Sequence, residues 1–78
     1  MARNLNNLAL LYYHEGKYAK AEPLFKQALA IDEKALGPEH PDVAMMAENL
    51  AGVLRKLGRE SEAKVYEEQA ARIRAKMN

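Results

Sequence analysis

The chain has 78 residues, of which 49% are hydrophobic, and its 12 basic and 11 acidic side chains leave a net charge of +1. This length allows one small domain, and the well-mixed charges argue against the clustered basic face that nucleic acid binding requires. The chain has no Cys, which excludes disulfides and thiolate metal sites, and no apolar run approaches the length of a membrane span. We therefore expect a cytoplasmic protein without nucleic acid or membrane partners.

The first half of the sequence predicts two amphipathic helices. The first covers residues 3–14, where apolar residues recur every three or four positions, and Gly16 follows its end. The second covers residues 18–35 and contains Pro23, which we expect to bend its first turns without breaking it, because the apolar spacing continues through it. The expected core face of the first helix consists of Leu5, Leu8, Ala9 and Tyr12.

The second half repeats this pattern after a stiff connection, "LGPEHPDVA" at residues 36–44. Pro41 suits the first position of a third helix over residues 41–57, and a fourth is predicted over residues 60–76. The aromatic residues expected to pack in the core are Tyr12, Tyr18, Phe25 and Tyr66.

The two halves are related by a shift of 42 residues, which aligns ten identical pairs over 36 positions without a gap. A fixed period with one pair of helices per unit indicates an α-solenoid. The pairs include Asn7 and Asn49, Leu8 and Leu50, Ala9 and Ala51, Gly16 and Gly58, Ala21 and Ala63, Ala28 and Ala70, and Ile31 and Ile73.

The first repeat resembles the tetratricopeptide repeat family in the residues Leu5, Leu8, Ala9, Tyr12, Gly16, Tyr18, Ala21, Phe25 and Ala28. The usual unit has about 34 residues, and the longer spacing here, with its "LGPEHPDVA" connection, is similar to the kinesin-light-chain and nephrocystin type. The resemblance implies an all-α fold, an α-solenoid of two helical hairpins whose four antiparallel helices stack in a right-handed superhelix. It implies one domain over residues 1–78, with repeat one at about 2–38 and repeat two at about 41–78.

The resemblance also implies a concave groove that binds a protein or an extended peptide, lined by the first helix of each repeat. By position, the groove residues are Arg3, Asn6, Asn7, Leu10 and Tyr13, followed by Glu48, Asn49, Gly52, Arg55 and Lys56. We expect Asn7 and Asn49 to lie side by side and to bind a peptide backbone, although amides that tie neighbouring helices together are the alternative. The cations Arg3, Arg55 and Lys56 are expected to favour acidic peptides.

Catalysis is not supported by any motif. His14 and His40 lie in predicted turns, the chain has no Cys nucleophile and no Ser–His–Asp candidate set, and neither a phosphate loop nor metal-ligand spacing is present. His40 is interpreted as a cap or turn residue before Pro41. We expect neither an enzyme nor a cofactor nor a bound metal.

A second hypothesis is a structural scaffold that associates with itself. Solenoids usually need about three repeats to bury their apolar surfaces, and this chain has two. We expect Leu5, Leu11 and Tyr12, on the outer surface of the first repeat, to form a homo-oligomeric contact with two-fold symmetry. A piece cut or engineered from a longer array is an equal interpretation.

Overall fold

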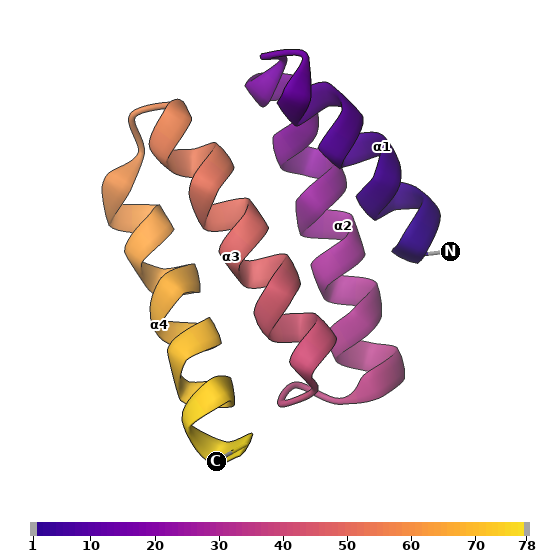
Figure 1. The fold of residues 1–78 in the computed structure, drawn as a ribbon, viewed down its shortest axis with the longest axis vertical. Helices are drawn as coiled ribbons and strands as arrows, with labels where there is room; N and C mark the ends of the chain where they lie inside the picture. The colour runs from indigo at the N-terminus through magenta and orange to yellow at the C-terminus, as the bar shows by residue number, and fades with distance from the viewer. Residues whose placement is uncertain (1, 78) are drawn as a thin grey trace.

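The computed structural model describes the backbone of residues 2–77 and the side chains of residues 4–76. Its four α-helices are α1 (Ala2–His14), α2 (Tyr18–Leu36), α3 (Pro41–Lys56) and α4 (Glu60–Met77). Each helix packs against the next in chain order and runs antiparallel to it (Figure 1). The fold is all-α, as the sequence predicts, and every helix boundary lies within one residue of the predicted one.

The two short turns, one in each half of the chain, have the same backbone geometry. Gly16 has a φ of +79° and Gly58 a φ of +78°, a left-handed conformation that glycine adopts without strain. In both turns the residue after the glycine donates its N–H to the carbonyl oxygen five residues earlier, at 2.8 Å. This bond pattern belongs to the Schellman motif, which satisfies the last carbonyls of a helix. The 42-residue repeat of the sequence is thus matched by equivalent turns.

The connection between the hairpins is fixed by a histidine cap. His40 has an extended backbone, and its Nδ1 accepts a hydrogen bond from the backbone N–H of Asp42 at 3.1 Å. Pro41 occupies the first turn of α3, where its missing N–H needs no partner. The interpretation of His40 as a cap is confirmed, and the acceptor role requires its Nδ1 to be unprotonated.

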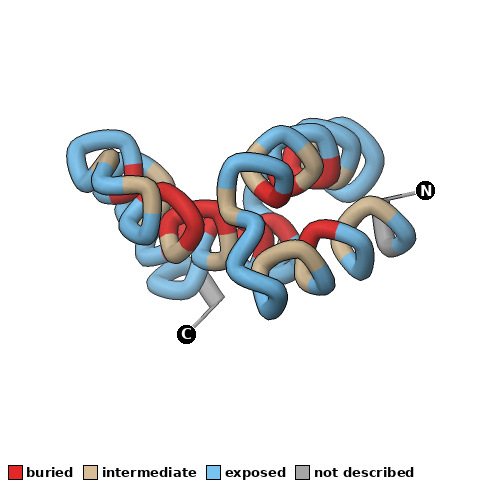
Figure 2. Tube along the Cα trace, turned by 90° about the horizontal axis from the view of Figure 1, so that it is seen from above, coloured by how far each residue is buried: buried red, intermediate tan, exposed pale blue. Residues whose placement is uncertain are grey.

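The buried residues lie on the sides of the helices that face one another (Figure 2), and α3 lies between α2 and α4 (Figure 1). α3 contributes the large buried side chains Met46, Leu50 and Leu54, and Phe25 of α2 is fully buried beside them. α2 runs unbroken through Pro23, as expected. The other aromatic residues of the predicted core are half-buried and pack against it, namely Tyr12, Tyr18 and Tyr66.

One prediction about the core was wrong: Leu8 lies on the surface. Leu8 and two further residues of repeat one are 36–53% exposed, whereas their counterparts 42 residues later are at most 3% exposed. The three pairs are Leu8 and Leu50, Leu11 and Val53, and Ile31 and Ile73. The difference arises because α3 packs against both α2 and α4, whereas α1 packs mainly against α2 alone. We call the surface formed by Leu8, Leu11 and Ile31 the open face.

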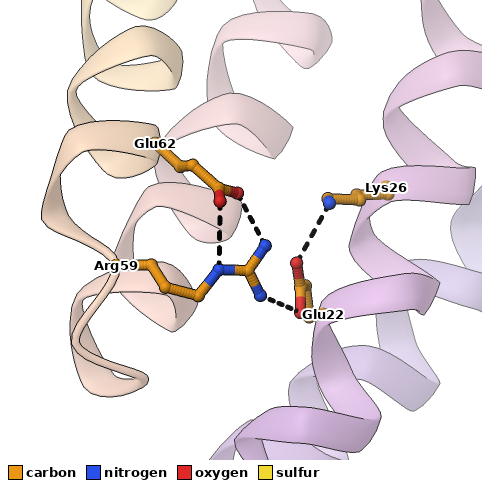
Figure 3. Close-up of polar contacts among 4 residues, drawn as sticks. All are labelled: Glu22, Lys26, Arg59 and Glu62. Atoms are coloured by element: carbon orange, nitrogen blue, oxygen red, sulfur yellow. Dashed lines mark hydrogen bonds and ion pairs between the residues drawn. The ribbon is translucent and has the colours of Figure 1, made fainter.

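The two hairpins are joined by an ion network centred on Glu22 (Figure 3). The carboxylate of Glu22, on α2, accepts a hydrogen bond from Nη1 of Arg59 at 2.7 Å and forms an ion pair with Lys26 at 3.0 Å. Arg59, in the turn before α4, also binds Glu62 through two hydrogen bonds of 2.6 and 3.2 Å. Because Arg59 holds residues of both hairpins, the network helps to fix the angle between them.

Acid should weaken this junction. Partial burial raises the pKa of Glu22, but hydrogen bonds and charge from Lys26 and Arg59 outweigh it and hold the pKa below its usual 4.5. A carboxylate with a lowered folded pKa stabilises the fold fully above its unfolded pKa, and this contribution is lost as pH falls through the folded value. We expect Glu22→Gln to lower the free energy of unfolding at pH 7 by about 1 kcal/mol.

Urea unfolding of both proteins between pH 7 and pH 3 measures this contribution. The difference in stability between wild type and Glu22→Gln should shrink below about pH 4.5. Glu68→Gln, at an exposed position of α4 without an ion pair among the described residues, is the matched control and should leave the profile unchanged. A difference that stays constant down to pH 3 contradicts the assigned role of Glu22.

Candidate functional site

A pocket of about 110 Å³ opens between α1 and α3. Its lining residues come from three helices: Leu10 and Tyr13 from α1, Phe25 from α2, and Glu48, Asn49 and Gly52 from α3. We call it the Gly52 pocket. Five of these six residues are among those that the sequence placed in the groove, and the structure brings them together around one hollow.

The fold positions the pocket walls through helix periodicity. Leu10 and Tyr13 are three residues apart on α1, as are Asn49 and Gly52 on α3, so each pair occupies one face of its helix. The ring of Tyr13 is held by an edge-to-face contact with Tyr18, with centroids 5.4 Å apart. Sequence reasoning assigned Phe25 to the core alone and missed its place in the pocket lining.

Gly52 lines the pocket, and its backbone conformation does not require a glycine. The glycines with positive φ are those of the turns, and Gly52, inside α3, is not among them. A Cβ atom at this position would meet only Oη of Tyr13, at 3.9 Å, an ordinary van der Waals distance. The equivalent residue of repeat one is Leu10, so a large side chain occurs at the matching helix position.

The charges near the pocket are paired within the chain. Both carboxylate oxygens of Glu48 accept hydrogen bonds from the guanidinium of Arg74 on α4, at 2.7 and 3.0 Å. These bonds raise the pKa of Arg74 above its usual value. Arg55, predicted to hold acidic ligand groups, binds Glu67 of α4 at 2.6 Å instead of standing unpaired.

The predicted asparagines differ in their surroundings. Asn49 is half-buried in the pocket lining, whereas Asn7 is exposed, and no hydrogen bond joins the two amides. Asn6 is half-buried, and its Oδ1 is buried without a hydrogen-bond partner among the described residues. Lys56 is exposed at the end of α3, and the side chain of Arg3 lies outside the described residues.

The residues of the predicted self-association site fall into two groups. Leu11 is exposed and belongs to the open face. Leu5 and Tyr12 are half-buried and pack against the core of their own chain, and the ammonium groups of Lys17 and Lys20 lie over the Tyr12 ring. Sequence reasoning missed Ile31 as part of the open face, because the alignment with Ile73 identifies an apolar position but not whether a neighbouring helix covers it.

Two further properties concern the described part of the chain. Its helices do not combine the length and the apolar character needed to cross a bilayer. Its His, Asp and Glu side chains nowhere gather in threes with the spacing of a metal site.

Two stacked helical hairpins with equivalent turns and a pocket between their first helices define a helical-repeat protein. A sequence comparison names the family: the tetratricopeptide repeat profile matches residues 1–76, nearly the whole chain. The chain therefore belongs to the tetratricopeptide repeat family, and it is a protein–protein interaction module in the general sense that this family implies.

Proposed function

We propose that residues 1–78 act as one non-catalytic module that holds an extended peptide in the groove between α1 and α3. The observation that carries the proposal is the Gly52 pocket, which combines apolar walls with the amide of Asn49, a side chain without a hydrogen-bond partner among the described residues. Binding sites typically join such an apolar hollow to a few polar groups that fix orientation. The amide of Asn49 can both donate to and accept from a peptide backbone, which suits an extended ligand.

An acidic peptide is the ligand class that we propose for this groove. Lys56 follows Gly52 by one helical turn and is exposed, without a carboxylate partner among the described residues. Arg55 contributes less to ligand binding, because Glu67 already neutralises it. The 42-residue spacing, similar to the kinesin-light-chain type, supports the same class, since those repeats hold peptides with acidic flanks.

The test is the double variant Asn7→Ala with Asn49→Ala, measured by fluorescence anisotropy against a library of acidic and hydrophobic ten-residue peptides. Loss of two amide contacts should weaken the best wild-type binders by about tenfold or more. Asn4→Ala, an exposed asparagine of α1, is the matched control and should bind as wild type does. The groove proposal fails if no peptide binds, or if the double variant binds as tightly as wild type.

Self-association is a second candidate function, favoured by the open face. Leu8, Leu11 and Ile31 are exposed on repeat one, although the same positions of repeat two are buried. Exposed apolar surfaces of this kind usually mark an interface. A homo-oligomeric scaffold would cover the open face with a second copy of the chain.

A further inference from the structure

Gly52 is a helix-interior residue that the fold itself does not explain. Glycine is among the least favourable residues inside a helix, because it loses the most backbone freedom. Its backbone here is not left-handed, and a Cβ would meet only Oη of Tyr13, at 3.9 Å. Neither local strain nor close helix packing therefore requires a glycine at this position, whereas a side chain here would extend toward Tyr13 and take up part of the adjoining pocket.

The size of the pocket limits what it can hold. Its volume is about 110 Å³, while an apolar cavity of roughly 150 Å³ is known to take up benzene. A short branched aliphatic side chain fits this space better than an aromatic one. Leu10, the buried Phe25 and the ring of Tyr13 provide apolar surface for it.

The charges of the lining exclude a charged occupant. Glu48 is the only charged residue of the lining, and both of its carboxylate oxygens are bonded to Arg74. A charged side chain entering the pocket would lose water without gaining an unpaired partner, which is unfavourable. An uncharged side chain is therefore the complementary one.

We propose that the Gly52 pocket receives a single valine, leucine or isoleucine side chain of the peptide bound in the groove. The inference rests on the proposed peptide-binding function and adds to it the residue that the module selects. Asn49, three residues before Gly52 on the same helix face, is placed to bond the peptide backbone next to that side chain.

The experiment compares wild type with Gly52→Leu, which places in repeat two the residue that repeat one has at Leu10. The probes are fluorescent ten-residue acidic peptides that differ at one position, carrying valine, leucine, isoleucine, glycine, tryptophan, aspartate or lysine. Wild type should prefer the three aliphatic peptides over the glycine peptide by about ten- to a hundredfold. Gly52→Leu should abolish that preference by filling the pocket.

Two further variants keep the result interpretable. Gly52→Ala favours the helix and only narrows the pocket, so it should fold and should shift the preference from leucine toward valine. Ala30→Leu adds the same side chain at an exposed position of α2 outside the pocket lining and should bind as wild type does. Circular dichroism verifies that each variant remains helical.

The outcomes separate this inference from the groove proposal. If peptides bind and depend on Asn7 and Asn49, but ignore the varied side chain and the Gly52 substitutions, the pocket assignment is wrong and the groove stands. A preference for the tryptophan, aspartate or lysine peptide also overturns the assignment. If no peptide of the set binds wild type, both proposals are wrong.

Discussion

Replacing Leu50 with Ala should lower the free energy of unfolding by about 2–5 kcal/mol. Leu50 is fully buried in α3, between the two hairpins, and its truncation leaves a cavity that the surrounding helices fill only in part. A domain of this size has a total stability of roughly 5–10 kcal/mol, so the variant should be close to unfolding at 37 °C. Thermal unfolding followed by circular dichroism measures the loss.

Leu8→Ala is the matched control, because Leu8 is the same residue type at the equivalent position of repeat one. It is 41% exposed, and we expect its truncation to cost less than about 1 kcal/mol at low protein concentration. Similar losses for both variants would contradict the arrangement described here, because they would place Leu8 and Leu50 in equivalent surroundings.

The purified chain should form a dimer at high micromolar concentration, with twice the monomer mass of 8.8 kDa. The open face, formed by Leu8, Leu11 and Ile31, is the surface that we expect to be buried. Sedimentation equilibrium measures the mass. The double variant Leu8→Lys with Leu11→Lys should remain a monomer, because burying the face would then bring like charges together without partners.

A two-fold contact is expected in preference to head-to-tail stacking. In head-to-tail stacking the open face of one copy would pack on α4 of the next, as α3 packs on α2 within the chain. The α4 counterparts of the buried Phe25 and Leu29 are Glu67 and Ala71, so α4 lacks the large apolar side chains that α2 offers. Two open faces packed on each other bury apolar surface from both copies and close the assembly.

Val65→Lys is the control for the dimer, since Val65 is 60% exposed on α4, outside the open face. It should leave the dimer intact. A wild-type mass of 8.8 kDa at high micromolar concentration removes the self-association hypothesis, and so does a dimer that persists in the Leu8→Lys and Leu11→Lys variant.

The helices, turns and repeat could be predicted because their signals are local. Apolar spacing defines a helix face, Gly16 and Gly58 each follow the last residues of an apolar helical pattern, and the cap at His40 depends on residues next to it. The 42-residue shift then links the halves without any knowledge of their contacts. These features follow from the chain alone and hold in the structure.

The solvent exposure of Leu8 and the ion pair between Arg55 and Glu67 could not be predicted in the same way. Periodicity identifies the apolar face of a helix but not whether a neighbour covers it, which is why Leu8 was expected in the core. The bond between Arg55 and Glu67 depends on the antiparallel register of α3 and α4, which places residues twelve apart in sequence side by side. The same register pairs Glu48 with Arg74 and so decides which charges remain for a ligand.

The most direct test of the central claim, that the groove between α1 and α3 binds peptide, is amide chemical-shift mapping of labelled protein during titration with an acidic, leucine-containing peptide. We predict the largest shift changes at Tyr13, Asn49 and Gly52, with small changes along the exposed side of α4. Shift changes confined to α4 or to the open face, with the amides of Asn49 and Gly52 unaffected at saturation, would contradict it.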